Sequence, residues 1–225
     1  MFFLRGQINM TNTQHLRLTF PVGPLSCNCT IIGDRVTGHA IVIDPGGDAD
    51  KILTILEENH FKLVAILHTH AHLDHFFASG ILREKTGAPL YLHQADTFLW
   101  KAVDFQCQML GIPPVVIPDP DRWLKDEDAL SVANGITLHT PGHTPGSVSF
   151  LFESLNLLIA GDTLFKGSIG RTDLPGGDFS QIEKSIQERI YSLDEQLIVI
   201  TGHGPETQIG QEKHHNPFVR AQKEL

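Results

Sequence analysis

The sequence predicts an α/β fold, and two features of the chain lead to this prediction. Apolar runs typical of strands alternate with segments of helical periodicity, an order that favours sheets covered by helices. Four of the apolar runs end in an aspartate or a histidine, namely Asp44, His70, Asp162 and His203. Because ligand sites in α/β sheets gather at the carboxyl ends of strands, we expect one site assembled from several loops.

The first half of the chain contains a strand, helix, strand unit that leads into a cluster of histidines. The turn "PGG" at 45–47 separates the first of these strands from the helix, and the proline-rich run "GIPPVVIPDP" is expected to be a loop. We expect strands over residues 15–20, 29–33, 39–44, 62–67 and 89–93, and helices over about residues 48–58, 74–85 and 95–110.

The second half repeats this theme. We expect strands over residues 136–140, 148–153, 156–162 and 196–204, with a hairpin around "ESLN", and a helix over about residues 179–191. The segments "LHTHAH" (67–72) and "LHTPGH" (138–143) are similar, which aligns His72 with His143. This similarity suits a fold built from two related halves.

The length and composition limit the class of protein. The 225 residues suffice for one large domain, and we expect a flexible N-terminal extension over residues 1–12 before a single domain over 13–225, with Met10 as an alternative start. The net charge of -9, with no cluster of Lys and Arg, argues against nucleic-acid and anionic-membrane partners. No apolar run reaches the roughly 18 to 20 residues of a membrane span. The odd count of 3 cysteines favours a reducing cytoplasm.

Histidine is the unusual component, with 13 residues in the chain. The stretch "LHTHAHLDHF" (67–76) spaces four candidate metal ligands as His70-x-His72-x-Asp74-His75. A structural zinc takes about four ligands, and a catalytic zinc keeps one position for water. With the further candidates His143, Asp162 and His203, the chain offers more ligands than one ion needs. A second ion, or a set of residues that bind no metal, is therefore implied.

Taken together, these motifs resemble the metallo-β-lactamase superfamily. The resemblance rests on HxHxDH after a buried strand, a histidine in "PGHTPG", an aspartate in a "GD" pair and a histidine in "GHG", and it spans about residues 14–220. The segments "GRTDLPGG" (170–177), "TGHGPETQIG" (201–210) and "HNPF" (215–218) are similar to its short glyoxalase II-like, or hydroxyacylglutathione hydrolase-like, branch. The resemblance implies a four-layer αββα sandwich.

The resemblance also implies a set of ligands for two divalent ions. It assigns His70, His72 and His143 to the first ion, and Asp74, His75 and His203 to the second, with Asp162 between them. Zinc is expected, and iron or manganese would also suit these donors. Two ions about 3.5 to 4 Å apart acidify a shared water, and Asp74 would hold the resulting hydroxide as it attacks a thioester such as S-lactoylglutathione or a related ester.

The roles of several neighbouring residues stay open at this stage. Asp44 either fixes a ligand histidine or only begins a turn. Arg171 and Asp173 either shape the loop beside the site or form a surface ion pair. Full-length glyoxalase II carries a helical C-terminal domain that contacts glutathione, whereas this chain ends soon after His203, so the binding of the substrate tail is open.

Other functions fit parts of the pattern. A persulfide dioxygenase of the same superfamily keeps these motifs but uses one iron, and a non-catalytic metal-binding protein would hold metal without turnover. An amidohydrolase barrel also has HxH after a strand, but 225 residues is short for a barrel. We therefore expect a metal-dependent hydrolase that acts on a small molecule, as a monomer or a small homo-oligomer.

Overall fold

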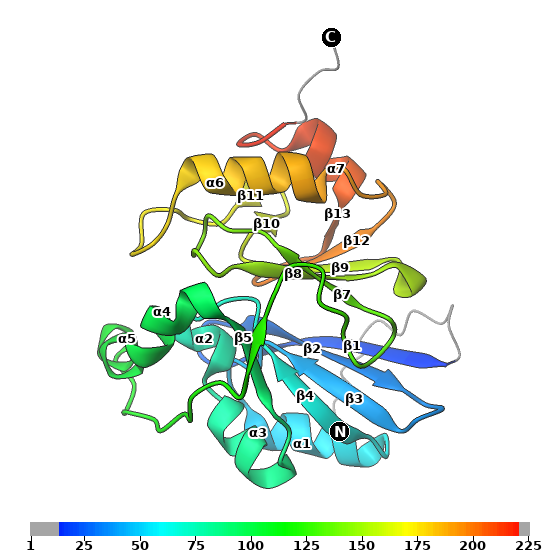
Figure 1. Cartoon of the computed structure of the whole chain (residues 1–225), viewed down its shortest axis with the longest axis vertical. Helices are drawn as coiled ribbons and strands as arrows, with labels where there is room; N and C mark the ends of the chain where they lie inside the picture. Colours follow the sequence, from blue (N-terminus) through cyan, green and yellow to red (C-terminus); the bar gives the residue numbers. More distant parts are fainter. Residues whose placement is uncertain (1–13, 221–225) are drawn as a thin grey trace, which may run out of the picture.

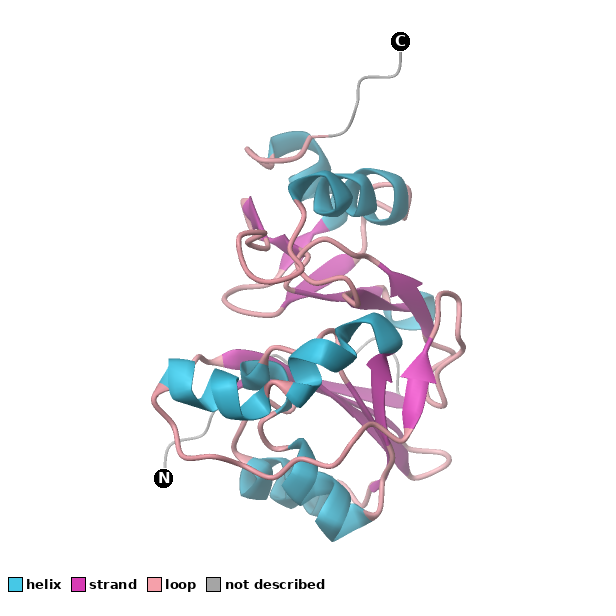
Figure 2. Cartoon of the chain, turned by 60° about the vertical axis from the view of Figure 1, so that its left-hand side comes forward, coloured by secondary structure: helices cyan, strands magenta, loops and turns pink. Residues whose placement is uncertain are grey.

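The computed structural model describes residues 14–220, which form four layers (Figure 1). Two β-sheets face each other, and helices cover the outer face of each sheet, as Figure 2 shows from a second direction. The predicted αββα arrangement is confirmed. The extension predicted over residues 1–12 lies outside the described residues, and the single domain over 13–225 stays a prediction.

The first sheet has six strands in the order in which they occur in the chain. Its strands are β1 (His15–Val22), β2 (Cys27–Asp34), β3 (His39–Ile43), β4 (Lys62–Leu67), β5 (Leu90–His93) and β6 (Arg122–Leu124). The first three pair antiparallel, whereas β3 to β6 pair parallel. Parallel strands end at the same edge, so the polar residues after β3 and β4 lie next to each other.

The second sheet has five strands in the order β13-β12-β9-β8-β7. These are β7 (Ile136–His139), β8 (Val148–Phe152), β9 (Leu157–Gly161), β12 (Ile198–Thr201) and β13 (Thr207–Gln208). The hairpin predicted around "ESLN" is the antiparallel pair β8 and β9, joined by the short helix η2 (Glu153–Leu155). A separate hairpin of β10 (Leu164–Phe165) and β11 (Ser168–Ile169) follows Asp162.

Three apolar layers join the four structural layers. Alternation along the strands sends successive side chains to opposite faces, as in β3, where Ala40 and Val42 pack under the helices while Ile41 and Ile43 pack between the sheets. The outer helices of the first sheet are α1 (Ala49–Glu58), α2 (Leu73–Phe76), α3 (Ser79–Thr86), α4 (Thr97–Lys101) and α5 (Val103–Leu110). Those of the second sheet are α6 (Phe179–Lys184), its π-helical continuation η3 (Ser185–Ile190) and α7 (Ile209–His215).

The helix predicted over residues 74–85 is wrong in one respect, because it is two helices, α2 and α3. The amide of Ala78 donates to the Pro45 carbonyl oxygen at 2.9 Å instead of continuing the helix. The Asp74 carbonyl oxygen lies so close to Gly46 that a Cβ there would be 1.6 Å from it. The "PGG" turn therefore packs directly against this segment and divides it.

The helix predicted over residues 95–110 is likewise divided, into η1 (Gln94–Asp96), α4 and α5. The Gln106 side chain donates to the Leu99 carbonyl oxygen at 2.9 Å, and the Ala102 amide also donates to this carbonyl. These bonds replace the helical bond that Leu99 would accept, and the axis turns at Ala102.

The helices of residues 14–220 include none with the length and apolar character of a membrane span.

Candidate metal centre

The seven residues predicted as metal ligands lie together at one edge of the facing sheets. Four come from the loop and helix that follow β4, one from the loop after β7, one from the end of β9 and one from the loop after β12. They form three overlapping groups whose ligand atoms lie within 4.8 Å of one another: His70, His72 and His143; His70, His75 and Asp162; and Asp74, His75 and His203.

The first cluster is made of three imidazoles. His72 Nδ1 lies 3.1 Å from His70 Nε2 and 2.9 Å from His143 Nε2. The two histidines that the sequence similarity aligned, His72 and His143, thus meet at one point. These three nitrogens form one face of a site for a single ion.

The second cluster is made of two imidazoles and a carboxylate. His203 Nε2 lies 3.1 Å from Asp74 Oδ2 and 3.3 Å from His75 Nε2. The Asn28 amide donates to the Gly202 carbonyl oxygen at 2.8 Å, which fixes the loop that carries His203 against β2. The second cluster therefore depends on contact between the two sheets.

Asp162 lies between the clusters. Its Oδ2 is 3.6 Å from His143 Nε2 in the first cluster, and its Oδ1 is 3.4 Å from His75 Nε2 in the second, as an ion-pair contact without hydrogen-bond geometry. Oδ1 is one of two buried side-chain polar atoms without a hydrogen-bond partner in the described part of the chain. A buried carboxylate oxygen without a partner is costly, and a cation would satisfy it.

Each ligand histidine except His72 is oriented through its other ring nitrogen. His75 Nδ1 lies 3.0 Å from Asp44 Oδ2, His143 Nδ1 donates to the Arg171 carbonyl oxygen at 2.8 Å, and His203 Nδ1 donates to the Leu25 carbonyl oxygen at 3.0 Å. A ring that donates outward presents a lone pair inward, as metal-binding histidines do. These donors and the unpartnered Asp162 oxygen fit two divalent ions.

Thr69 connects Asp44 to the first cluster. Its hydroxyl donates to Asp44 Oδ2 at 2.7 Å and lies 3.1 Å from His70 Nδ1, from which it accepts. Asp44 also accepts from the Thr69 amide at 2.8 Å. Of the two interpretations of Asp44, orientation of a ligand histidine therefore matches the geometry.

The charges of the two clusters differ. Burial, with the neighbouring imidazoles of His143 and His75, lowers the pKa of His72 to about 4, and burial likewise holds the pKa of His70 well below its usual value. Burial also acts to lower the pKa of His75, but Asp162, Asp74 and Asp44 outweigh it and hold that pKa well above the usual value. His70 and His72 are therefore neutral near pH 7, whereas the second cluster is a network of ion pairs.

Asp74 stays ionised throughout the neutral pH range. Burial acts to raise its pKa, but the charge of His75 and the bond from His203 lower it below the usual value. Cys27, 3.5 Å from His75 Nδ1, remains a thiol because burial raises its pKa to about 12. Asp74 is thus the acceptor that the second cluster offers to a water or a cation.

Two glycines allow the backbone to approach Asp162. A Cβ on Gly202 would lie 1.8 Å from Asp162 Oδ1, and a Cβ on Gly170 would lie 1.8 Å from the Asp162 carbonyl oxygen. Any larger residue at these positions would displace the carboxylate that lies between the clusters. The first glycine of "GHG", Gly202, and the first glycine of "GRTDLPGG", Gly170, therefore have a steric reason.

Arg171 and Asp173, whose role the sequence left open between shaping the loop and a surface ion pair, contact each other in the loop after β11. They form a bidentate pair at 2.7 Å, with side chains 61% and 68% exposed. The backbone of Arg171, through its carbonyl oxygen, is what contacts His143. Of the two interpretations, the surface ion pair describes these side chains.

Three residues that support the loops of the two clusters could not be predicted from the sequence: Thr69, Asp96 and Gln106. Gln106 accepts from the Leu73 amide at 2.8 Å and donates to the Ala71 carbonyl oxygen at 3.1 Å. These residues act on backbone groups or through another side chain, so they have no motif of their own. Asp96 falls at the start of the helix predicted over residues 95–110, where nothing in the sequence indicates its contact with a loop 25 residues away.

Fold and site together define an αββα protein with two adjacent clusters of histidine and aspartate at the edge of its sheets. The chain belongs to the metallo-β-lactamase superfamily, whose family model matches residues 22–203. The two relatives described next are both named as hydrolases.

Two relatives match nearly the whole chain. Hydroxyacylglutathione hydrolase GloC of Haemophilus influenzae is 38% identical over 205 residues, covering 89% of this chain and 96% of the relative. The probable metallo-hydrolase YqgX of Bacillus subtilis is 40% identical over 203 residues, covering 88% and 95%. Similarity over the full length of both relatives supports the same fold throughout the chain.

Three solved structures are similar in fold and sequence. TTHA1623 in a di-iron-bound form has a TM-score of 0.83 at 35% identity, covering 90% of this chain and 100% of that one. The B3 metallo-β-lactamase BLEG-1 has a TM-score of 0.80 at 38% identity, covering 91% and 99%. ETHE1 from Myxococcus xanthus has a TM-score of 0.74 at 28% identity, covering 90% and 83%.

Proposed function

We propose that the protein is a binuclear metal-dependent hydrolase that cleaves a thioester of the S-lactoylglutathione type. The observation that carries this proposal is the position of Asp162, whose two oxygens face histidines of different clusters while Oδ1 has no hydrogen-bond partner. The similarity to a hydroxyacylglutathione hydrolase over 89% of this chain supports the thioester as substrate class.

The residues divide the work of binding metal. His70, His72 and His143 would hold the first ion, Asp74, His75 and His203 the second, and Asp162 would contact both. Zinc is the ion we propose, with iron or manganese as alternatives, since imidazole and carboxylate suit all three. When bound, the two ions lower the pKa of water towards about 7 and polarise a carbonyl oxygen.

The protein side chains orient and protect the reaction. Asp74 is ionised and partly exposed, so it can accept a hydrogen bond from the attacking water and direct it to the thioester carbonyl carbon. Asp44 and the carbonyl oxygens of Arg171 and Leu25 keep the histidine rings from turning. The thiol of the substrate leaves as a thiolate, which needs little help from an acid because its pKa is low.

A persulfide dioxygenase is the second candidate, supported by the similarity to ETHE1 of Myxococcus xanthus. That reaction needs one iron, and the first cluster alone offers three imidazoles for it. The two candidates therefore differ in the number of ions the protein holds and in the use of oxygen.

One experiment separates these functions. Protein loaded with zinc, iron or manganese is analysed for metal per chain, then assayed for hydrolysis of S-lactoylglutathione and for oxygen uptake with glutathione persulfide. We expect close to two ions per chain and thioester hydrolysis without oxygen uptake. A cephalosporin serves as a third substrate because of the similarity to BLEG-1. Oxygen uptake with one iron and no thioester turnover would replace the first proposal by the second.

We make two further proposals, about the oligomeric state of the protein and about its location in the cell. We propose a monomer or small homo-oligomer, to be checked by light scattering, and a cytoplasmic location, to be checked by fractionation. The odd number of 3 cysteines supports a reducing compartment, and all are free and buried.

A further inference from the structure

Asp96 is a buried carboxylate outside the predicted ligand set. It lies in η1, between β5 and α4, and its side chain has no exposed surface. Its oxygens accept three hydrogen bonds: Oδ2 from the Ala71 amide at 3.0 Å and from the Thr144 hydroxyl at 2.7 Å, and Oδ1 from the Gly146 amide at 2.6 Å. No basic side chain accompanies it among these partners.

The partners of Asp96 belong to the two loops that carry the first cluster. Ala71 is the residue between His70 and His72, and Thr144 follows His143. One carboxylate therefore connects the loop after β4 with the loop after β7. No hydrogen bond links Asp96 to Asp74, His75 or His203 among the bonds of the described residues.

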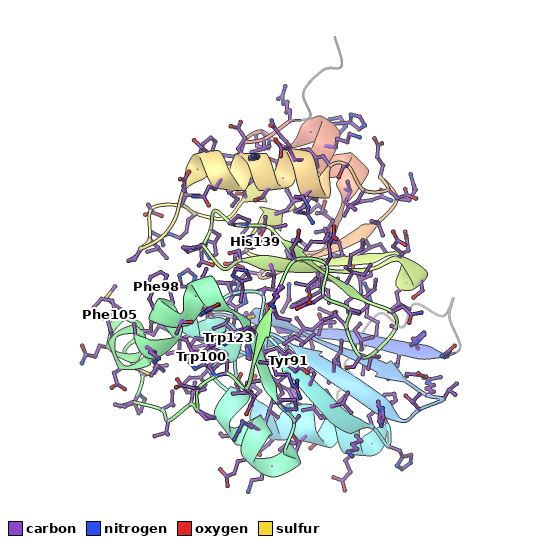
Figure 3. All side chains as sticks on the ribbon, in the orientation of Figure 1. Tyr91, Phe98, Trp100, Phe105, Trp123 and His139 are labelled. Atoms are coloured by element: carbon purple, nitrogen blue, oxygen red, sulfur yellow. The ribbon has the colours of Figure 1, made fainter. Side chains whose placement is uncertain are left out.

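Neighbouring groups make this connection rigid. The Ser147 hydroxyl accepts from the Thr144 amide at 3.0 Å, and Gln106 holds the Leu73 amide and the Ala71 carbonyl oxygen. A Cβ on Gly146 would lie 2.6 Å from Asp96 Oδ1, so only glycine permits the approach. Figure 3 labels Phe98 and Trp100 of α4, the helix that directly follows Asp96 in the chain.

Burying a carboxylate without a cation is expensive, which indicates that the bonds it accepts have a purpose. Burial raises the pKa of Asp96, and the bonds from Thr144, Gly146 and Ala71 oppose this rise. Removal of the carboxylate from such a group leaves buried donors unsatisfied, which destabilises the folded protein. Fold stability alone would be served as well by an apolar side chain.

We propose that Asp96 is a positioning residue that sets the spacing of the three imidazoles of the first cluster and thereby the affinity of the first ion. Asp96 touches neither metal nor substrate and acts through Ala71 and Thr144. This inference rests on the proposed function in one respect, namely that the first cluster holds a metal ion.

The test is the variant Asp96→Asn, which keeps the shape of the side chain but places an NH₂ group against groups that donate. The zinc affinity of each cluster is measured separately by chelator competition. The first cluster is measured in a His203→Ala background, which disables the second, and the second is measured in a His143→Ala background, which disables the first. We expect affinity at the first cluster to fall about 10- to 100-fold, as for groups that orient metal ligands. Affinity at the second cluster should change less than about twofold, because Asp96 has no hydrogen bond to the residues of that cluster.

Two further variants connect the effect to the hydrogen bond. Thr144→Val removes one of the three bonds and should weaken zinc binding at the first cluster, and Thr144→Ser, which keeps the hydroxyl, should restore it. Glu212→Gln is the matched control, because Glu212 is a buried carboxylate that accepts from Gly167, Thr207 and Asn216 away from the clusters. It should lower the melting temperature and leave both zinc affinities unchanged.

The outcomes separate this inference from the proposed function. Unchanged affinity at the first cluster in Asp96→Asn, or an equal loss at both clusters, would overturn the positioning role. If Asp96→Asn does not fold, an unchanged affinity in Thr144→Val has the same consequence. A wild-type protein that binds two ions but hydrolyses no thioester would defeat the proposed function and leave the positioning role standing.

Discussion

The two ligand clusters share Asp162 and the loop after β4, yet the protein holds them in different ways. In the second cluster the rings themselves are fixed, since His75 bonds to Asp44 and His203 to the Leu25 carbonyl oxygen. In the first cluster, the rings of His70 and His143 are fixed in the same way, but His72 has no outward bond among those described for its ring, and Asp96 fixes the backbone beside it instead.

This difference shows that a histidine can be held in position through its ring or through the backbone of its loop. A histidine held through its ring depends on one direct contact, whereas one held through the backbone depends on residues that do not touch its side chain. Substitution of a residue that both clusters share should therefore affect both, and substitution of a residue that supports one cluster should affect that cluster more than the other. The following predictions test that comparison, beginning with the largest effect.

Asp162→Asn should affect both clusters to a similar extent, because both lose the same carboxylate. We expect metal content to fall at both sites and hydrolysis to fall more than 100-fold, since even a residue that only orients a ligand costs about 10- to 100-fold. Metal analysis after gel filtration and initial rates check this. Full metal content in the variant would contradict the shared role of Asp162.

Gly202→Ala should disturb the second cluster most. Its Cβ would lie 1.8 Å from Asp162 Oδ1 and 2.9 Å from His75 Cε1, so the carboxylate and the ring must move apart. Gly204→Ala is the matched control, because Gly204 has φ +76° but nothing within 4 Å of a Cβ. We expect Gly204→Ala to lose about 1 kcal/mol of stability from backbone strain and to keep its metal. Equal metal loss in both variants would show that strain, not contact, is responsible.

Acid should weaken the scaffold beneath the first cluster through His68. This ring donates from Nδ1 to the Tyr91 carbonyl oxygen and accepts at Nε2 from the Ser79 hydroxyl, each at 2.7 Å. Burial lowers its pKa to about 4. The unfolded chain takes up this proton near pH 6.5, so the unfolded state binds more protons between these values. Stability should therefore fall as pH decreases from about 6.5 to about 4, by about 3 kcal/mol.

Urea unfolding of the metal-free protein at pH 7.5 and pH 4.5 measures this effect. His68→Gln is the comparison, because it removes the titrating ring and should lose less stability between the two pH values than the wild type does. The same loss in both proteins would assign the acid sensitivity to other groups.

Thr69→Val should have the smallest effect and should act on the first cluster more than on the second. The variant removes the hydroxyl that joins Asp44 to His70 and leaves the bond from His75 to Asp44 in place. We expect about a tenfold loss of affinity at the first cluster, the lower end for an orienting group. Chelator competition in the two single-site backgrounds measures it, and a larger loss at the second cluster would contradict the comparison.

The sequence was a good guide where a motif and a strand coincide. The strand over 62–67 was predicted to the residue, and the seven predicted ligands lie together because β4, β9 and β12 end at one edge. The helices over 74–85 and 95–110 were predicted as continuous because their periodicity is continuous. Hydrogen bonds to residues outside the local helical pattern divide them: the Ala78 amide bonds to Pro45 in the first case, and the Gln106 side chain bonds to Leu99 in the second.

The supports of the site were harder to predict, for a physical reason. Asp96 bonds to groups 25, 48 and 50 residues away, and two of these groups are backbone amides that every residue except proline has. The short strands β6, β10, β11 and β13, with two or three residues each, are too brief to show a period. Asp44 could be foreseen as a candidate because it ends a strand, but only the fold shows that it holds His75.

The positions of the ligands along the chain determine when the site can form. His72 meets His143 across 71 residues, and His75 meets His203 across 128 residues, so the clusters join segments that leave the ribosome at different times. The first cluster has its three imidazoles once the β7 loop has folded, whereas the second waits for β12, which is synthesised later. On the proposed assignment of two ions, a nascent chain can bind the first ion before the second site exists, so metal loading would occur in two steps.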